Sequence, residues 1–139
     1  MSMQSIPYGN SGRNAMGIPV ACYSAIGMDM SELRRLIWVS GQLAYNERNE
    51  FVGGGDVRAQ TEQCLVNIER NLRELGGSID DVVQVTVFVK DMSHLEAIHE
   101  VRLRHFSIPY PTSTLVAVSG FVHPDALIEI NAVAAVRSA

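Results

Sequence analysis

Glu129 is a single carboxylate in the otherwise uncharged stretch ALIEINAVAAV (126–136), and it is the residue whose setting most suggests chemistry. Leu127, Ile128 and Ile130 surround it, and a carboxylate among apolar side chains loses hydration free energy unless it is paired or has a function. A strand that alternates its two faces would instead point Glu129 into water. The sequence leaves both interpretations open, a site carboxylate or a solvated strand residue.

Three hydroxyl side chains, Thr112, Ser113 and Thr114, follow Pro111 in the stretch IPYPTSTLVAV (108–118). Hydroxyls both donate and accept hydrogen bonds, so they could form the lip of a binding pocket. The prolines and the apolar residues that follow are equally typical of a turn that leads into a strand. The residues alone support both interpretations.

The histidines do not have the spacing of a metal site. His94, His99 and His105 fall on one expected helix. His99 lies roughly 140° around this helix from His94, and His105 lies roughly 16 Å along the axis from His94. Zinc-ligand pairs do not use that spacing, and the chain has no HExxH motif. His123 precedes Pro124 and is interpreted as a turn residue that could reach a pocket mouth. We expect no metal and no other cofactor.

Other reactive patterns are also better explained as structure. The run GGGD (53–56) lacks the GK[ST] of a phosphate-binding loop, so it is interpreted as a loop that ends in a helix cap. Cys64 falls on the apolar stripe of a helix and is expected to be a buried structural thiol. Cys22 stays ambiguous. Two distant cysteines without a CxxC pair indicate a reduced, cytoplasmic setting.

Composition points to one globular domain. The chain has 139 residues, of which 47% are hydrophobic and 19% charged, enough to build its own core. We interpret residues 1–17 as a polar N-terminal arm and residues 18–139 as a single domain, with neither a targeting signal nor a membrane span. A formal net charge of −4 argues against nucleic acid as a partner.

Hydrophobic periodicity predicts strands and helices in a definite order. Asp56 is the expected N-cap of the first helix and Gly76 and Gly77 its stop, while Ser93 and Glu96 form an expected capping box for the second. The expected segments are a strand at 33–43, a helix at 57–75, a strand within 80–91, a helix at 93–106 and strands at 114–118 and 126–136. This order predicts an α+β sandwich with both helices on one face of the sheet. The strand VTVFV is apolar on both faces, so the uncovered face is expected to meet another subunit.

Three stretches together resemble the Rid (YjgF-type) family of reactive-intermediate deaminases: WVSGQL (38–43), RAQTEQCLVNIERNLRELGGSIDDVVQVTVFVKDM (58–92) and PTSTLVAVSGFVHPDALIEINAVA (111–134). The turn VSGFVHPDALIEI resembles the aminomuconate-deaminase-like branch. The resemblance implies a chorismate-mutase-like fold with a mixed β-sheet, assembled as a homotrimer with small-molecule sites in the clefts between subunits. It also implies hydrolysis of enamines or imines to keto acids and ammonia without a cofactor.

The resemblance assigns roles to individual residues. Glu129 corresponds to a pocket glutamate that positions the attacking water, Ser40 and Gly41 would line the cleft with backbone donors, and Phe88 would pack against the ligand. Tyr23, within CYSAIG (22–27), resembles an N-terminal tyrosine motif, although its gap to SGQ is about four residues longer than usual.

Thr114 and His123 complete the expected binding residues, and Ser113 marks a departure from the family pattern. Active members begin this strand with Pro-x-Arg-[Ser/Thr], and the arginine grips a substrate carboxylate. Here a serine stands at that position, and loss of the charged clamp should cost roughly a few kcal/mol of binding free energy. A simple 2-imino acid is therefore not the expected substrate, unless Arg102 or Arg104 substitutes in space.

Two alternatives to a divergent deaminase remain. The first is a non-catalytic small-molecule-binding or regulatory trimer of the same fold, which kept the assembly and lost the chemistry. The second is the ribonuclease or translation-inhibitor activity associated with older names of this family, against which the acidic net charge argues.

Overall fold

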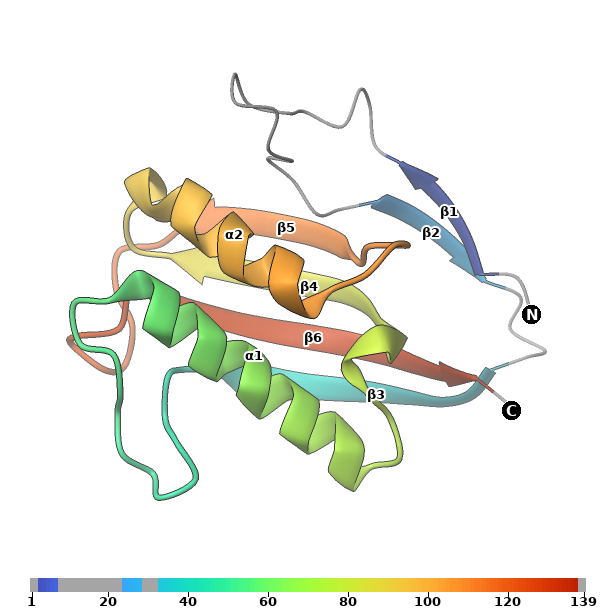
Figure 1. Cartoon of the computed structure of the whole chain (residues 1–139), viewed down its shortest axis with the longest axis horizontal. Helices are drawn as coiled ribbons and strands as arrows, with labels where there is room; N and C mark the ends of the chain where they lie inside the picture. The colour runs from blue at the N-terminus through green and yellow to red at the C-terminus, as the bar shows by residue number, and fades with distance from the viewer. Residues whose placement is uncertain (1–2, 8–23, 29–32, 138–139) are drawn as a thin grey trace.

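The fold consists of two layers, with two helices on one face of a mixed four-stranded sheet (Figure 1). The computed structural model describes residues 3–7, 24–28 and 33–137, with side chains for the last range. The strands of the sheet are β3 (Leu33–Gln42), β4 (Val82–Val89), β5 (Thr112–Ala117) and β6 (Ile128–Arg137), and the helices are α1 (Val57–Glu74) and α2 (Leu95–His105). The α+β class predicted from periodicity is confirmed.

Strands β1 (Met3–Pro7) and β2 (Ser24–Met28) form a separate antiparallel pair. Strand β1 falls within the stretch that the sequence suggested as a polar arm. No helix in the described part of the chain is both long and apolar enough to cross a membrane.

The last strand of the chain occupies the interior of the sheet. The strand order is β3-β6-β4-β5, in which β6 is antiparallel to both β3 and β4, while β4 and β5 are parallel. Helix α1 connects β3 to β4, and α2 connects β4 to β5 as the crossover that a parallel pair requires. Strand β6 therefore contacts two strands from earlier in the chain.

Alternation along the strands divides the sheet into a buried face and a helix-free face. Val85, Val87 and Val89 of β4 are fully buried beneath the helices, together with their register partners on β6. Phe88 and its partner Glu129 point to the other face, and both are half-buried. The placement of Glu129 is thus set by strand alternation.

Helix α1 begins and ends where the sequence predicted. The Asp56 carboxylate accepts a hydrogen bond from the Ala59 N–H at 3.1 Å, which satisfies one of the unpaired amides of the first turn. At the other end Gly76 adopts a φ of 83°, and the Gly77 N–H donates to the Leu72 carbonyl at 2.8 Å. Both predicted helix boundaries are confirmed.

The capping box predicted for the second helix is wrong. Residues Met92–His94 form a short 3₁₀ turn, and α2 begins only at Leu95 with no side-chain cap. The Asp91 carboxylate accepts the Ser93 N–H, and this hydrogen bond holds the pKa of Asp91 below its ordinary value. Asp91, two residues before Ser93, caps the 3₁₀ turn. Ser93 therefore lies inside that turn and cannot cap the helix.

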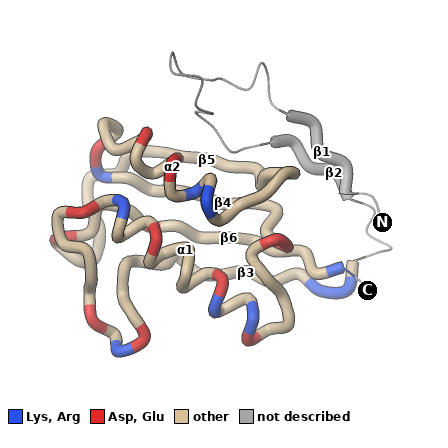
Figure 2. The backbone as a smooth tube through the Cα atoms, in the orientation of Figure 1, with Lys and Arg blue, Asp and Glu red and all other residues tan. Residues whose placement is uncertain are grey.

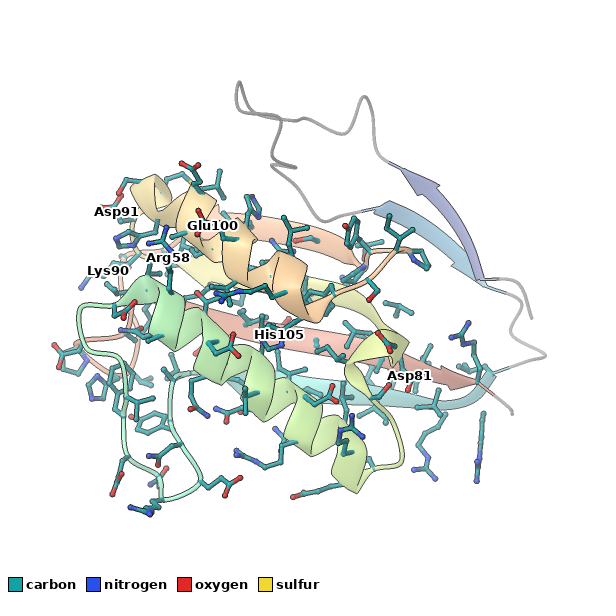
Figure 3. All side chains as sticks on the ribbon, in the orientation of Figure 1. Arg58, Asp81, Lys90, Asp91, Glu100 and His105 are labelled. Carbon is teal, nitrogen blue, oxygen red and sulfur yellow. The ribbon has the colours of Figure 1, made fainter. Side chains whose placement is uncertain are left out.

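The two helices are joined by polar side-chain contacts on their outer surface. Arg58 of α1 contacts Glu100 of α2 at 3.0 Å, and His105 of α2 contacts Glu62 of α1 at 2.7 Å (Figure 3). Acidic and basic residues are interspersed over both helices (Figure 2). Because Arg58 and Glu100 are largely solvent-exposed, this pair is expected to add little stability, and the helices are held mainly by their buried apolar faces.

Gln60 connects α1 to two loops and to the start of β6. Its side chain is fully buried, and its Nε2 donates to the carbonyls of Gly53 at 2.9 Å and Asp125 at 3.0 Å. Its Oε1 accepts the Leu127 N–H at 2.8 Å. One side chain therefore satisfies three backbone groups, and β6 begins at Ile128, two residues later than predicted, directly after the segment that Gln60 holds.

We expect Gln60→Leu to lower the free energy of unfolding by about 3 kcal/mol, because it leaves buried backbone groups without partners. Chemical denaturation would measure the change. Gln63→Leu on the same helix removes one partly buried side-chain bond and should cost no more than about 1 kcal/mol. Equal losses for the two variants would contradict the role assigned to Gln60.

Candidate functional site

A β-bulge in β3 creates the immediate surroundings of Glu129. The register of β3 against β6 shifts between Val39, which pairs with Ala132, and Gln42, which pairs with Ile130. Three steps along β3 therefore match two along β6, and the extra residue lies in the Ser40–Gly41 segment. This segment is exposed and lies beside Glu129 on the neighbouring strand.

Gly41 leaves room for the Glu129 carboxylate, which lies directly against its backbone. A Cβ atom added at Gly41 would lie 2.8 Å from Oε2 and 2.9 Å from Cδ of Glu129. Any side chain at this position would push the carboxylate away. The glycine of the SGQ stretch and the glutamate, 88 positions apart in the chain, thus form one structural unit.

Glu129 belongs to a row of residues that crosses the helix-free face. In register, Phe88 of β4 lies between Glu129 of β6 and Val116 of β5. Thr114 lies two residues before Val116 on the same face and is exposed. The structure therefore brings together Gly41, Glu129 and Phe88 of the sequence-predicted site, with Ser40 next to Gly41 and Thr114 further along the same face. The row places a carboxylate beside an aromatic ring on an open surface.

The charge of Glu129 also affects the buried thiol beneath the sheet. Cys64 of α1 is fully buried, and burial together with the negative charge of Glu129 raises the pKa of its thiol to about 12. The thiolate is therefore not formed near neutral pH, and the prediction of a structural cysteine is confirmed.

Ser113 lies on the opposite face of the sheet from Glu129. It pairs with the buried Val85, and its Oγ accepts a hydrogen bond of 2.7 Å from Nη2 of Arg102. Arg102 of α2 is only 1% exposed. Its guanidinium thus reaches Ser113, but on the helix-covered face of the sheet. Arg104 also lies on α2, and it is exposed. The sequence could not find this contact, because residues 102 and 113 lie on different elements joined by a loop.

His99 also contacts Arg102 beneath α2. Its Nδ1 lies 3.5 Å from Nη1 of Arg102. Burial, and secondarily the positive charge of Arg102, lower the pKa of His99 to about 4. The imidazole is therefore neutral near neutral pH. A neutral ring next to the guanidinium avoids repulsion between two cations inside the fold.

His123 lies in an aromatic cluster that joins two loops. Its ring stacks on Phe51 with centroids 3.8 Å apart and planes 7° apart, and Tyr45 meets both rings edge-on. Its Nδ1 accepts the Asp125 N–H at 3.0 Å, as in a turn. The interpretation of His123 as a turn residue agrees with this geometry. The aromatic partners lie about 70 residues earlier in the chain, so no local pattern indicated them.

Two further predictions from the sequence concern Tyr23 and Cys22, and the binding of a metal. Tyr23 and Cys22 lie outside the described residues. Within the described part of the chain, no three His, Cys, Asp or Glu side chains gather in a way that could hold a metal ion.

The chain is similar to known proteins of one family. A family model described as endoribonuclease L-PSP matches residues 15–136. The 3-aminoacrylate deaminase RutC of Acinetobacter baylyi is 41% identical over 99 residues, which cover 71% of this chain and 78% of that protein.

Solved structures show the same fold. YyfB of Yersinia pestis, a protein of the conserved Rid family, has a TM-score of 0.78 at 27% identity and covers 98% of this chain and 100% of its own. TdcF of Escherichia coli, solved with bound serine, has a TM-score of 0.67 at 29% identity, with 81% of this chain and 86% of that chain covered.

The fold and the matches define an α+β domain of the Rid type. The chain belongs to the endoribonuclease L-PSP family, which includes the Rid and RutC proteins, and the resemblance seen in its sequence is confirmed. The similarity to a 3-aminoacrylate deaminase supports a deaminase or imine-processing role in this family.

The low pKa of His99 predicts a pH-dependent stability. Between pH 6.5 and about 4 the unfolded chain binds more protons at this residue than the folded chain, so the free energy of unfolding falls as the pH falls. Allowing for partial solvent screening, we expect a contribution of ~1–2 kcal/mol over this window. Denaturation at pH 7 and pH 4.5 should show a smaller loss in His99→Gln than in the wild type. Parallel losses in the two proteins would exclude His99 as the source.

Proposed function

We propose that this protein is a hydrolytic deaminase that acts on an imine, or on an enamine through its imine tautomer. The observation that carries the proposal is the Glu129 carboxylate held against the backbone of Gly41 and beside Phe88 on an open sheet face. A carboxylate in this setting can act as a general base toward a water molecule, and the neighbouring ring offers an apolar contact for the substrate.

The proposed reaction consumes one water and releases one ammonia. Glu129 accepts a proton from the water as the water oxygen bonds to the C=N carbon, and it passes this proton to the imine nitrogen, giving a neutral carbinolamine. Glu129, ionised again, then accepts the hydroxyl proton and passes it to the nitrogen as the C–N bond breaks, so that the carbonyl forms and ammonia leaves. Backbone N–H groups of the exposed Ser40–Gly41 bulge are the proposed donors that orient the substrate.

The substrate is proposed to lack a carboxylate next to the imine carbon. Ser113 stands at the position of the family arginine, and the nearby guanidinium of Arg102 points to Ser113 from the helix side of the sheet. Neither residue supplies a positive charge to the Glu129 face in this geometry. A carboxylate bound there would therefore be placed near Glu129 without a charged clamp, at an electrostatic cost.

The assembly is proposed to be a homotrimer whose subunits close the cleft. The helix-free face exposes Trp38, with 69% of its surface accessible, along with Leu36 and Val116. Exposed apolar side chains grouped on one sheet face are typical of a protein–protein interface. Tyr23, Thr114 and His123 are proposed to contribute to the walls of the cleft in this assembly.

A binding protein without catalysis is the second candidate. The observation that favours it is the Arg102–Ser113 hydrogen bond, because it engages the residue that the sequence resemblance matches to an arginine of active family members. Ribonuclease activity is less consistent with the chain, since its net charge of −4 opposes contact with phosphates.

We expect the purified protein to accelerate ammonia release from a neutral imine, such as that formed from propylamine by an amine oxidase, and not from 2-iminopropionate formed from alanine. A coupled ammonia assay measures both rates. Glu129→Gln should abolish the acceleration, and Gly41→Ala should reduce it at least about tenfold by displacing the carboxylate.

Glu74→Gln, an exposed site on α1, is the matched control and should leave the rate unchanged. Full activity of Glu129→Gln would remove this residue from the mechanism. Rapid hydrolysis of 2-iminopropionate would overturn the proposed substrate class. Binding of neutral imine analogues without any turnover would favour the non-catalytic alternative.

The proposed trimer predicts that a charged side chain introduced on the helix-free face prevents association. Sedimentation velocity should give the mass of three chains for the wild type and of one chain for Trp38→Glu, because burial of an unpaired carboxylate opposes association. Leu75→Glu, which changes an exposed apolar residue after α1, should remain trimeric. A monomeric wild type at all concentrations tested would reject the assembly.

A further inference from the structure

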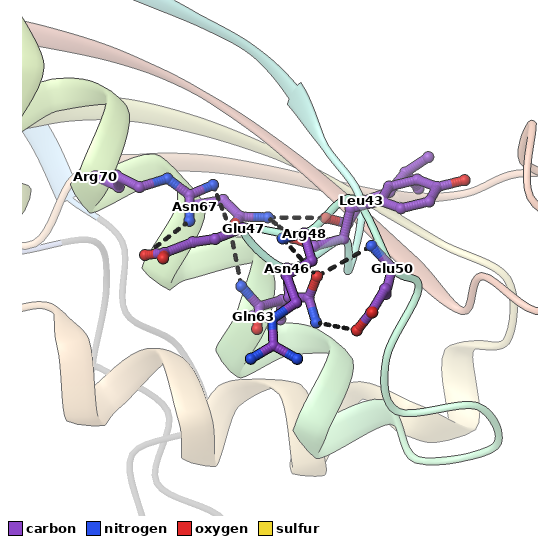
Figure 4. A network of polar contacts seen from close by, with 9 residues as sticks. Leu43, Asn46, Glu47, Arg48, Glu50, Gln63, Asn67 and Arg70 are labelled. Carbon is purple, nitrogen blue, oxygen red and sulfur yellow. Dashed lines mark hydrogen bonds and ion pairs between the residues drawn. The ribbon is translucent and has the colours of Figure 1, made fainter.

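A cleft on the helix layer has features of a second binding site. It lies between the loop that follows β3 and the outer surface of α1, and its volume is about 360 Å³. Figure 4 shows several of the polar side chains that line it. Two arginines contribute to its lining, which consists of Asn46, Glu47, Arg48, Gln63, Val66 and Arg70. The volume is in the range of small-molecule sites. The cleft lies on the helix layer, whereas Glu129 points to the helix-free face.

One nitrogen of the Arg70 guanidinium is hydrogen-bonded to Asn67, and the other forms only a weak ion pair with Glu47. Its Nη2 donates to Oδ1 of Asn67 at 3.0 Å. Its Nη1 is buried, has no hydrogen-bond partner among the described residues, and lies 3.6 Å from Oε1 of Glu47. That distance exceeds a hydrogen bond, and Glu47 is 81% exposed, so the ion pair contributes little and Glu47 can move away.

Asn67 fixes this arrangement from within the fold. The residue is only 2% exposed, and its Nδ2 donates to the carbonyls of Leu43 at 3.1 Å and Tyr45 at 2.8 Å. Its Oδ1 also accepts a hydrogen bond from Nε2 of Gln63 at 2.8 Å. The Arg70 guanidinium is therefore oriented before any ligand arrives, which reduces the entropy lost on binding.

Asn46 shapes the loop that carries Arg48. Its Oδ1 accepts the N–H groups of Arg48 at 2.9 Å and Glu50 at 3.0 Å, and its Nδ2 donates to the Glu50 carboxylate at 3.0 Å. Both polar atoms of the Asn46 side chain therefore form hydrogen bonds within the loop. The second cation of the cleft thus sits on a hydrogen-bonded turn.

We propose that this cleft binds a small aliphatic carboxylate. The carboxylate replaces Glu47 at Nη1 of Arg70 and is shared with Arg48, because guanidinium groups bind carboxylates through paired N–H donors. The aliphatic stem lies against Val66, a residue of the cleft wall that is 40% exposed. The site is independent of the reaction proposed at Glu129.

The probe for this site is sodium valerate, titrated into protein with ¹⁵N-labelled arginine side chains and followed by NMR. The Arg70 and Arg48 side-chain signals should shift with a Kd on the order of 1–10 mM. Glu47→Gln removes the competing carboxylate and should tighten binding several-fold, whereas Arg70→Gln should weaken it at least tenfold. Arg73→Gln, one turn away and paired with Glu69, is the matched control and should bind as the wild type does.

Other results would overturn the proposal. Shifts reproduced by sodium chloride at equal ionic strength, or by 1-pentanol, would show that no carboxylate site exists. Glu47→Gln is a surface change that tests the site even if Arg70→Gln is unstable, and unchanged affinity in this variant would reject displacement of Glu47. Glu129→Gln should keep valerate binding, so loss of the proposed deaminase activity and loss of this site are distinguishable.

Discussion

The interior position of β6 determines which side chains of this protein are available for chemistry. Because β6 pairs with both β3 and β4, every second residue of it is covered by the helices and the others face away from them. Ile128 and Ile130 therefore join the core, while Glu129 between them reaches the open face. A carboxylate in a central strand is tolerated here because alternation directs it out of the core, next to a glycine that leaves room for it.

The helix layer is organised by a few buried polar side chains, each of which joins segments distant in sequence. Gln60 binds two loops and the start of β6, and Asn67 binds the loop after β3. Arg102 reaches from α2 to Ser113 at the start of β5. Each contact satisfies polar groups that burial would otherwise leave unpaired, so these residues fix the loops around the sheet in single positions.

Local signals were sufficient where the determining interaction is itself local. Asp56 caps α1 because its carboxylate bonds three residues along the chain, and Gly76 ends the helix because its own φ is positive. The start of α2 was mispredicted, because Asp91, two residues before Ser93, caps a short turn that precedes the helix. The contact between Glu129 and Gly41 could not be derived from spacing, because it depends on a bulge in the pairing of β3 with β6.

The sequence by itself determined the fold class, the family, the boundaries of α1 and the choice of Glu129 as the candidate site residue. These follow from periodicity, caps and motif order, which are written along the chain. Only the tertiary structure decided that Ser113 faces Arg102 instead of Glu129, and that His123 stacks on Phe51. Both outcomes depend on which strands and loops become neighbours, and that is set by the packing of the whole sheet against its helices.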